Sequence, residues 1–264
     1  MEQANYIHGT QPAEQARLRL LNELTNKSFI DFLQIEETNS VLEVGSGLGI
    51  LAQEVARRVP KGEVVGVEYS REQLTLVKTS LPNLNFTQGD AHALEFEDNH
   101  FDVVYCRYVL EHLTYPLQAL KEMYRVLKPD GKVFVQENNI LVNVFYPECP
   151  RFEALWKQFA MLQERFGGDA LIGKKLLPLL KQAGFQDIRL SIQPEIHYSG
   201  TPSFRPWIEN QIGNIGSAAK ELNLQQLATE EEMSLAIGEL RSWLERDDAC
   251  AFFYWNRASG VKRI

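Results

Sequence analysis

The stretch Val41-Leu-Glu-Val-Gly-Ser-Gly-Leu-Gly-Ile50 begins as an apolar, strand-like run, becomes a glycine-rich turn and continues into a helical pattern that ends at Val59. Three glycines in the turn, Gly45, Gly47 and Gly49, are spaced two residues apart. Glycine adopts positive φ and lets the backbone approach a bound molecule closely, and the following helix points its first amides at the same place. This stretch therefore predicts a strand, a ligand-binding turn and a helix.

Composition places the chain among ordinary globular proteins: its 264 residues are 44% hydrophobic and 23% charged. The net charge of -8 argues against a nucleic-acid partner, because nucleic-acid-binding surfaces are usually basic. The first residues lack the features of a signal peptide, and no stretch approaches the roughly 20 apolar residues of a membrane span. The three cysteines, Cys106, Cys149 and Cys250, have no paired spacing, so we expect reduced thiols, no metal site and a cytoplasmic location.

Strand and helix patterns alternate after the glycine turn. Predicted strands cover residues 40–44, 64–67, 84–88, 101–106 and 132–137, and predicted helices cover residues 50–59, 71–81 and 116–127. This alternation predicts βαβ units and a parallel, doubly wound, Rossmann-like α/β sheet. In such sheets ligands bind beyond the carboxyl ends of the strands. We therefore expect Glu68, Asp90, Arg107 and Glu137 to lie at the same edge as the glycine turn.

The remaining sequence predicts a cover over this edge. A long amphipathic helix is expected at residues 14–33, further helices at 151–166, 173–183, 206–227 and 230–246, and two more strands at 188–193 and 251–256. We divide the chain into a lead-in and helix that cover the cofactor site (1–37), a cofactor-binding core (38–137) and a remainder (138–264). The insertions at 138–171 and 197–247 are the expected substrate-binding parts.

Three acidic residues near the predicted strand ends can be interpreted in two ways. Glu68, after the second strand, can bind a ribose diol or be a solvated charge. Asp90, in Gly89-Asp90-Ala91, can accept from the amine of a heterocycle or simply belong to a turn. Glu43 lies inside an apolar strand, where an unpaired carboxylate is costly. It can orient the turn or hold a ligand ammonium group through water, and it can also cap neighbouring amides.

The spacing of the glycines bears on the type of ligand. A dinucleotide-binding turn places its third glycine three residues after the second, whereas here the third glycine is Gly49 and Ile50 occupies that position. This difference counts against a nicotinamide-dependent oxidoreductase, which stays the alternative enzyme class. A non-catalytic nucleoside-binding protein on the same scaffold is the other alternative.

Six motifs in order resemble those of the class I S-adenosylmethionine-dependent methyltransferases. They are Glu43-x-Gly45-x-Gly47-x-Gly49, Glu68 after the second strand, Gly89-Asp90-Ala91, Phe101-Asp102-Val103-Val104, Val109-Leu110-Glu111-His112-Leu113 and Arg125-Val126-Leu127-Lys128-Pro129-Asp130-Gly131-Lys132. The resemblance is close over residues 38–137. It implies a seven-stranded sheet that is mostly parallel with an antiparallel last strand, and S-adenosyl-L-methionine as the cofactor.

The resemblance also implies roles for individual residues. The glycine turn would run under the methionine and ribose, Glu68 would bind the ribose hydroxyls, and Asp90 and the Ala91 amide would bind the adenine. The complete set of expected cofactor-binding residues is Tyr6, Glu43, Gly45, Ser46, Gly47, Gly49, Glu68, Tyr69, Asp90, Ala91, Arg107 and His112. The expected reaction is transfer of the methyl group to O, N or C of a small-molecule acceptor.

The acceptor side is less defined by the sequence. A general base is needed only if the acceptor arrives protonated. The candidates are His112, His8 and His197, each of which can instead have a structural role, and the carboxylates Glu111 and Glu137. Candidate substrate contacts lie in or near the insertions: Asn138, Tyr146, His197, Tyr198 and Trp207. Trp156 and Trp243 occur at helical spacing, which is more typical of core residues.

Overall fold

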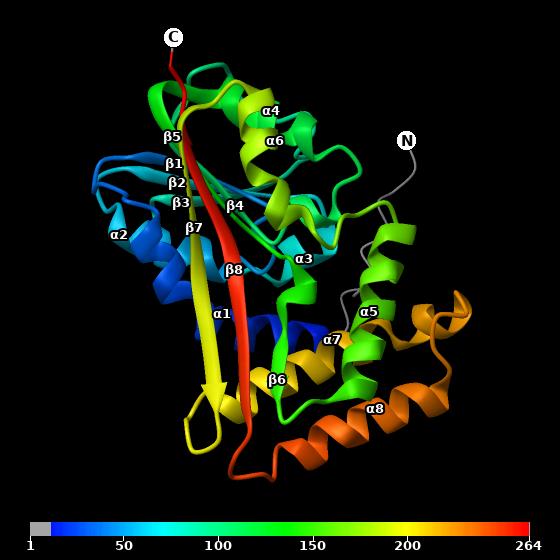
Figure 1. The fold of residues 1–264 in the computed structure, drawn as a ribbon. Coiled ribbons are helices and arrows are strands. Elements are labelled where there is room, and N and C mark those ends of the chain that lie inside the picture. The colour runs from blue at the N-terminus through cyan, green and yellow to red at the C-terminus, as the bar shows by residue number, and fades with distance from the viewer. Residues whose placement is uncertain (1–11, 264) are drawn as a thin grey trace.

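The computed structural model describes residues 12–263, which form one mixed sheet with helices packed around it (Figure 1). The strands are β1 (Ser40–Val44), β2 (Glu63–Glu68), β3 (Leu84–Gln88), β4 (Phe101–Arg107), β5 (Leu127–Glu137), β6 (Val144–Tyr146), β7 (Gln186–Tyr198) and β8 (Cys250–Val261). The α-helices are α1 (Pro12–Phe32), α2 (Ile50–Arg58), α3 (Arg71–Leu76), α4 (Pro116–Val126), α5 (Pro150–Arg165), α6 (Leu176–Ala183), α7 (Phe204–Leu224) and α8 (Glu230–Trp243). Short 3-10 helices are η1 (Leu110–His112), η2 (Ile140–Val142) and η3 (Ile172–Lys175).

The sheet has the order β3-β2-β1-β4-β5-β8-β6, and β7 pairs with the other edge of β8. Strands β1 to β5 are parallel, whereas β8 runs antiparallel to β5, β6 and β7. The predicted doubly wound sheet with an antiparallel last strand is therefore confirmed. The strand order reverses between β1 and β4, which places the switch point directly beside the glycine turn.

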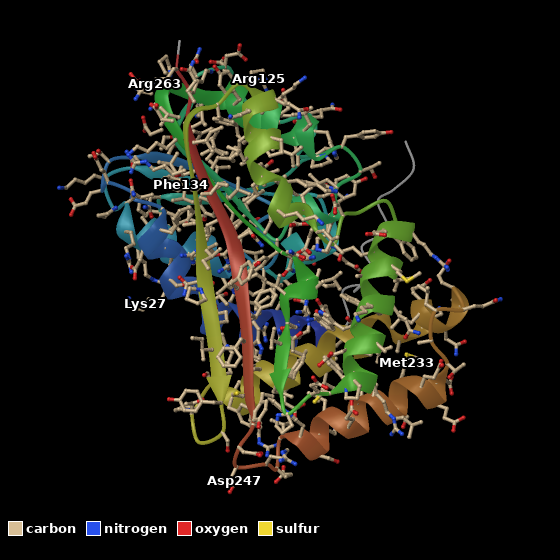
Figure 2. All side chains as sticks on the ribbon, viewed as in Figure 1. Lys27, Arg125, Phe134, Met233, Asp247 and Arg263 are labelled. Carbon is tan, nitrogen blue, oxygen red and sulfur yellow. The ribbon has the colours of Figure 1, made fainter. Side chains whose placement is uncertain are left out.

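Two hydrophobic cores cover the two faces of this sheet. On one face, Phe29 of α1 and Val55 of α2 pack with Tyr105 and Phe134. On the opposite face, α4 and α6 pack against alternate residues of the same strands, as expected because successive side chains of a strand point to opposite faces. A third core joins α5, α7 and α8 to the lower half of β8. Figure 2 shows Phe134 in the sheet and Met233 in this third core.

The helices of the third core form a cap, which we define as α5, α7 and α8. Helix α5 falls in the predicted insertion at 138–171, and α7 and α8 fall in the insertion at 197–247. Each was predicted as a helix from its apolar periodicity. Within residues 12–263, no helix combines the length and apolar character that crossing a membrane requires.

Some predicted boundaries were wrong. Helix α3 was expected to reach residue 81 but ends at Leu76, because it buries only Gln73 and so gains little from further turns. Residues 138–149 were expected to be irregular, yet Val144–Tyr146 forms β6 on the free edge of β8. This strand is the eighth of a sheet predicted to have seven. Strands β7 and β8 are also longer than predicted, since each extends along the other as a long antiparallel pair.

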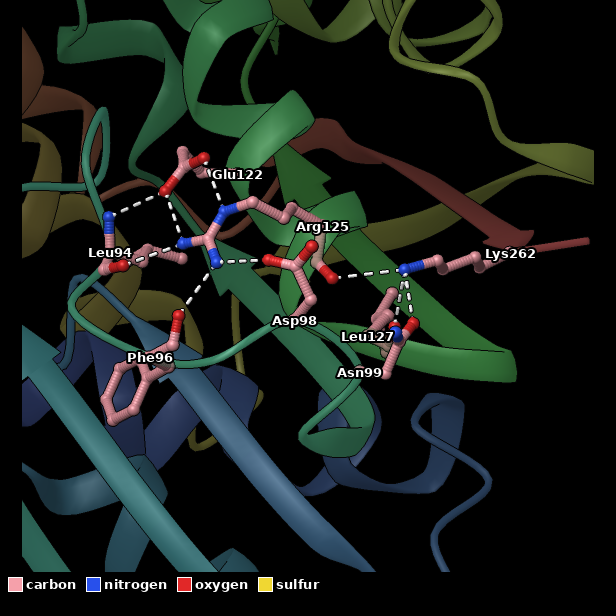
Figure 3. Close-up of polar contacts among 8 residues, drawn as sticks. All are labelled: Leu94, Phe96, Asp98, Asn99, Glu122, Arg125, Leu127 and Lys262. Atoms are coloured by element: carbon pink, nitrogen blue, oxygen red, sulfur yellow. Dashed lines mark hydrogen bonds and ion pairs between the residues drawn. The ribbon is translucent and has the colours of Figure 1, made fainter. Parts of the chain in front are cut away.

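A network around Arg125 fastens the loop that follows β3 (Figure 3). The Arg125 guanidinium donates to the carbonyls of Leu94 and Phe96 at 2.8 and 2.7 Å and pairs with Glu122 and Asp98 at 2.8 Å. A Glu122 oxygen in turn accepts from the Leu94 amide. Because Asp90 opens this loop, the network holds in place the segment that carries one of the predicted site residues.

Candidate active site

A cavity of about 830 Å³ lies beyond the carboxyl ends of β1, β2 and β4 and continues into the cap. Its strand-end half is lined by most of the residues predicted to bind a cofactor: Glu43, Gly45, Ser46, Gly47, Glu68, Tyr69, Asp90, Ala91, Arg107 and His112. Residues from five separate segments of the sequence thus meet at one place. Tyr6 and His8, which were also predicted to act here, lie outside the described residues.

The glycine turn has the conformation that its residues predict. Gly45, Gly47 and Gly49 all have positive φ, at 76°, 53° and 67°. A Cβ atom on Gly45 would lie 2.4 Å from a methyl carbon of Val109, so only glycine fits there. Gly49 has a different structural role from Gly45 and Gly47. It does not line the cavity, and a Cβ there would lie 2.4 Å from the Phe86 ring, so this glycine permits packing of the helix on the sheet.

The Glu68 carboxylate connects the turn with the end of β2. One oxygen accepts from the Gly47 amide at 2.8 Å, and the other accepts from the Ser70 amide at 2.9 Å. Ser70 caps α3 through its hydroxyl, which accepts from the Gln73 amide. The carboxylate is 9% exposed and lines the cavity, so it is fixed by backbone amides and still faces the space above the turn.

Burial and one neighbouring cation control the state of Glu43. Burial raises the pKa of the Glu43 carboxyl to about 8, although the positive charge of Arg107 opposes the shift. The Arg107 guanidinium donates to Asn22, Thr25 and Asn26 of α1 at 2.8, 3.2 and 2.7 Å. Arg107 therefore fastens α1 over the end of β4, and α1 becomes one wall of the cavity.

Two acidic residues near His112 have different environments. Glu137 is fully buried, and its two oxygens accept from the amides of Val109, Leu110 and Glu111 at 3.0, 2.9 and 3.3 Å. It does not line the cavity, so the structure gives this candidate base a place in the scaffold of η1 instead. Glu111 lines the cavity and lies 3.8 Å from His112 Nε2.

His112 itself lines the cavity where the strand-end half meets the cap. Burial lowers the pKa of His112, with the charge of Glu111 acting in the opposite direction. The imidazole is therefore neutral at neutral pH and has a nitrogen that can accept a proton. Among the candidate bases in the described residues, His112 and Glu111 line the cavity, whereas Glu137 and His197 do not.

The cap half of the cavity, which we call the chamber, is lined by aromatic rings and side-chain amides. Asn138 and Trp207, which were predicted to contact the substrate, line it. Tyr146 and Tyr198 are 62% and 52% exposed on the outer sheet surface, so the structure does not bring them to the chamber. His197 does not line the chamber. Its ring stacks on the Trp207 ring with a centroid distance of 4.5 Å.

Several chamber residues were missed by the sequence analysis. They come from α1, α5, α7 and β8: Asn22, Phe159, Gln163, Asn210, Gln211, Asn214, Phe253 and Trp255. Trp156 was expected in the core, yet it lines the chamber while remaining 6% exposed. Trp243, also expected in the core, is buried among Phe145 and Phe204. The amides on one face of residues 207–214 were the signal that could have indicated a polar lining.

Comparisons with known proteins agree with the strand-end motifs. Residues 42–135 match the family model described as a methyltransferase domain. An uncharacterized methyltransferase of Schizosaccharomyces pombe is 32% identical over 162 residues, which cover 61% of each chain. A ubiquinone/menaquinone biosynthesis C-methyltransferase of Pseudomonas aeruginosa is 34% identical over 124 residues, covering 44% of this chain and 48% of that protein. The chain thus spans about half the length of the curated relatives that it matches.

Solved structures extend the likeness to the whole fold. Phosphoethanolamine N-methyltransferase 2 of Haemonchus contortus, in complex with S-adenosyl-L-methionine, superposes with a TM-score of 0.56 at 21% identity, covering 95% of this chain and 53% of that one. The YcgJ protein of Bacillus subtilis superposes with a TM-score of 0.58 at 18% identity, covering 90% and 98%. At these identities the likeness concerns the fold. Residues 42–135 thus match the methyltransferase-domain family, and the solved structures share the fold that surrounds them.

Proposed function

We propose that this protein transfers the methyl group of S-adenosyl-L-methionine to an O, N or C atom of a small organic molecule. The observation that carries the proposal is the continuity of the cavity. One space of about 830 Å³ joins the strand-end residues of the methyltransferase domain to the chamber under the cap. A cofactor at the strand ends and an acceptor in the chamber would therefore share one enclosed volume.

The polar groups of the strand-end half fit this cofactor. Ser46 Oγ and Gln73 Oε1 are buried at the cavity wall and lack hydrogen-bond partners among residues 12–263. Buried polar atoms without partners are costly, and a polar ligand would supply those partners. The cofactor also carries an ammonium and a sulfonium group, and the Glu68 carboxylate at this end is complementary to positive charge.

We assign the cofactor contacts as follows. Glu68 would accept from the ribose hydroxyls, while Gly45 and Gly47 allow the backbone to run close beneath the ligand. Asp90 would accept from the adenine amine, and the Ala91 amide would donate to a ring nitrogen. Tyr69, whose side chain is 56% exposed at this edge, would cover one face of the adenine. The backbone beyond β4, at Arg107, would face the methionine ammonium.

When bound, the cofactor supplies an electrophilic methyl group on a positively charged sulfur. The protein then has to align the acceptor, exclude water and remove a proton where the acceptor carries one. Helices α1, α5 and α7 enclose the chamber, which meets the need to exclude water. We propose His112 as the general base, since it lies between the two halves of the cavity and its lowered pKa leaves it neutral.

Calorimetric titration with S-adenosylhomocysteine tests this proposal without requiring the acceptor to be known. We expect saturable binding at one site, and Asp90→Ala should weaken it by about tenfold or more because a charge-assisted hydrogen bond is lost. Glu97→Ala is the matched control, since Glu97 is an exposed acidic residue of the same loop. Absence of binding, or equal binding by the Asp90 and Glu97 variants, would contradict the proposal.

A further inference from the structure

We propose that the methyl acceptor is an uncharged, flat aromatic molecule that carries a hydroxyl or carbonyl oxygen, and that Trp207 and Gln211 bind this oxygen. The inference rests on the proposed function, because the chamber is the acceptor half of the same cavity. It goes further in naming the chemical class of the acceptor and the two side chains that select it.

Aromatic rings form a continuous wall from the strand ends into the cap. Tyr108, which follows β4, lies 4.4 Å from the Trp255 ring, and Trp255 lies 6.2 Å from Trp207. On α5, the rings of Trp156 and Phe159 stack 5.2 Å apart, and both line the chamber. Flat aromatic molecules gain both buried area and favourable ring-ring geometry in such surroundings. The wall therefore favours a planar ring over an extended polar metabolite.

The indole nitrogens separate Trp207 from the other tryptophans. The chain has four tryptophans, and three of them donate their N–H to an oxygen. Trp156 donates to the Ile140 carbonyl at 2.7 Å, Trp243 to the Pro147 carbonyl at 2.9 Å and Trp255 to Glu195 at 3.0 Å. Trp207 is 1% exposed and lines the chamber, and its Nε1 has no partner within residues 12–263. An occupant of the chamber is the partner that this donor lacks.

A second unpartnered group lies one helical turn away. Gln211 follows Trp207 by four residues on α7, so both side chains lie on the same face of the helix. Gln211 is 3% exposed and lines the chamber, and its Oε1 has no partner in the described chain. A hydroxyl oxygen can accept from Trp207 Nε1 and donate to Gln211 Oε1. A carbonyl oxygen can accept from Trp207 and from the amide nitrogen of Gln211 after rotation of that amide.

The Trp207 N–H selects against an ammonium acceptor, and the state of the two wall arginines selects against a phosphate. An ammonium group has donors only, so it cannot satisfy the Trp207 N–H, which is also a donor. A phosphate accepts hydrogen bonds but requires cationic partners when it is buried. Arg17, at the chamber wall, is bound to Glu14 at 2.5 and 2.8 Å and to Asn210 at 3.1 Å. Arg107 is bound to three side chains of α1. Both arginines of the wall are therefore already engaged within the protein.

Naphthalene and three of its 2-substituted derivatives serve as probes to test the inference on the unmodified chain. They are 2-naphthol, naphthalene, 2-naphthyl phosphate and protonated 2-(aminomethyl)naphthalene, each titrated calorimetrically at neutral pH with S-adenosylhomocysteine present. We expect 2-naphthol to bind about three- to tenfold more tightly than naphthalene, which is the effect of one or two neutral hydrogen bonds. The phosphate and ammonium probes should bind more weakly than naphthalene. Tighter binding of either charged probe than of 2-naphthol would overturn the inference.

Two single substitutions test whether Trp207 and Gln211 cause this selectivity. Trp207→Phe and Gln211→Leu should each reduce the ratio of 2-naphthol affinity to naphthalene affinity, because the polar partner is removed while an apolar side chain remains. Trp243→Phe is the matched control, since its N–H is bonded within the core, and it should keep the full preference. An unchanged preference in both chamber variants would overturn the assignment.

The binding of S-adenosylhomocysteine, measured first for every protein, separates this inference from the proposed function. If S-adenosylhomocysteine does not bind to the unmodified chain, the proposed function fails and the inference fails with it. If it binds but 2-naphthol shows no advantage over naphthalene, the inference alone fails.

Unfolding midpoints of all three variants are compared with that of the unmodified chain. The comparison of the four probes on the unmodified chain needs no variant, so a variant that does not fold leaves it intact.

Discussion

The backbone amide of Gly47 donates to a carboxylate oxygen of Glu68 across 2.8 Å. The second oxygen of the same carboxylate accepts from the Ser70 amide, at the start of α3. One side chain thus fastens the glycine turn, the end of β2 and the beginning of α3 to one another. The part of the cavity that we assign to the ribose is therefore arranged before any ligand arrives, which reduces the entropy that binding has to overcome.

Replacing this carboxylate should affect both binding and folding. We expect Glu68→Ala to weaken S-adenosylhomocysteine binding by about tenfold or more, and to lower the free energy of unfolding by about 1–3 kcal/mol as buried amides lose their acceptor. Calorimetry and urea unfolding measure the two effects. Glu63→Ala, at the exposed beginning of the same strand, should change neither by much. Equal behaviour of the two variants would contradict the role of Glu68.

Gly45→Ala should disrupt the turn itself. The residue has a φ of 76°, and the new Cβ would lie 2.4 Å from Val109. We expect a loss of about 1–3 kcal/mol in unfolding free energy and loss of S-adenosylhomocysteine binding. Gly238→Ala is the control, because no atom within 4 Å would meet a Cβ at this position in α8. That variant should be as stable as the unmodified chain or slightly more so, and a loss of stability as large as that of Gly45→Ala would count against the argument.

The raised pKa of Glu43 predicts a specific dependence of stability on pH. The pKa of this carboxyl is about 8 in the folded chain, against 4.5 ordinarily. Between these values the folded state holds a proton that the unfolded state has released, so the Glu43 contribution to stability falls as pH rises. In Glu43→Gln this contribution disappears, and the fall in unfolding free energy from pH 5 to pH 8 should be smaller by on the order of a few kcal/mol.

Urea unfolding of both proteins at the two pH values tests this expectation. Other groups with raised pKa values, such as Glu137, contribute equally to both proteins, so the difference in slope isolates Glu43. Identical slopes would show that Glu43 is already ionised in the folded state at neutral pH.

The cysteines should differ in reactivity. Cys106 and Cys149 are buried, with Cys106 fully inaccessible, whereas Cys250 is partly exposed at the start of β8. Because burial also raises the pKa of both Cys106 and Cys149, their reactive thiolates are scarce. Titration of the native chain with a thiol reagent should modify Cys250 first, and the other two only after unfolding. Cys250→Ser should abolish the fast phase, and its persistence would disagree with this burial pattern.

The sequence predicted the core of the fold because each of its elements has a local signal. The apolar runs of β1, β2 and β4 require burial on both faces, and the glycine turn and Pro116 mark where helices begin. The short strand β6 carries no such signal. Val144–Tyr146 becomes a strand only because β8, over a hundred residues later in the sequence, offers it a free edge. An element that depends on a distant partner cannot be found from its own residues.

The two halves of the candidate site differ in the same way. Glu43, Glu68 and Asp90 follow or belong to strands whose ends must converge in a parallel sheet, so their positions follow from topology. Chamber residues are placed by packing between helices, which no local pattern reports. Trp207 and Tyr198 were both candidate substrate contacts, yet one is buried in the chamber wall and the other lies exposed on the far surface of the sheet.

The position of β8 has a consequence for how the chain acquires its structure. This strand pairs with β5, β6 and β7, all of which precede it, and the segment between β7 and β8 contains α7 and α8. Contacts between residues so distant in sequence form slowly, since a long loop must close before they contribute. Trp255 and Phe253 of β8 are also part of the chamber wall. The glycine turn can therefore form early from local contacts, whereas the acceptor side is completed only when the last strand enters the sheet.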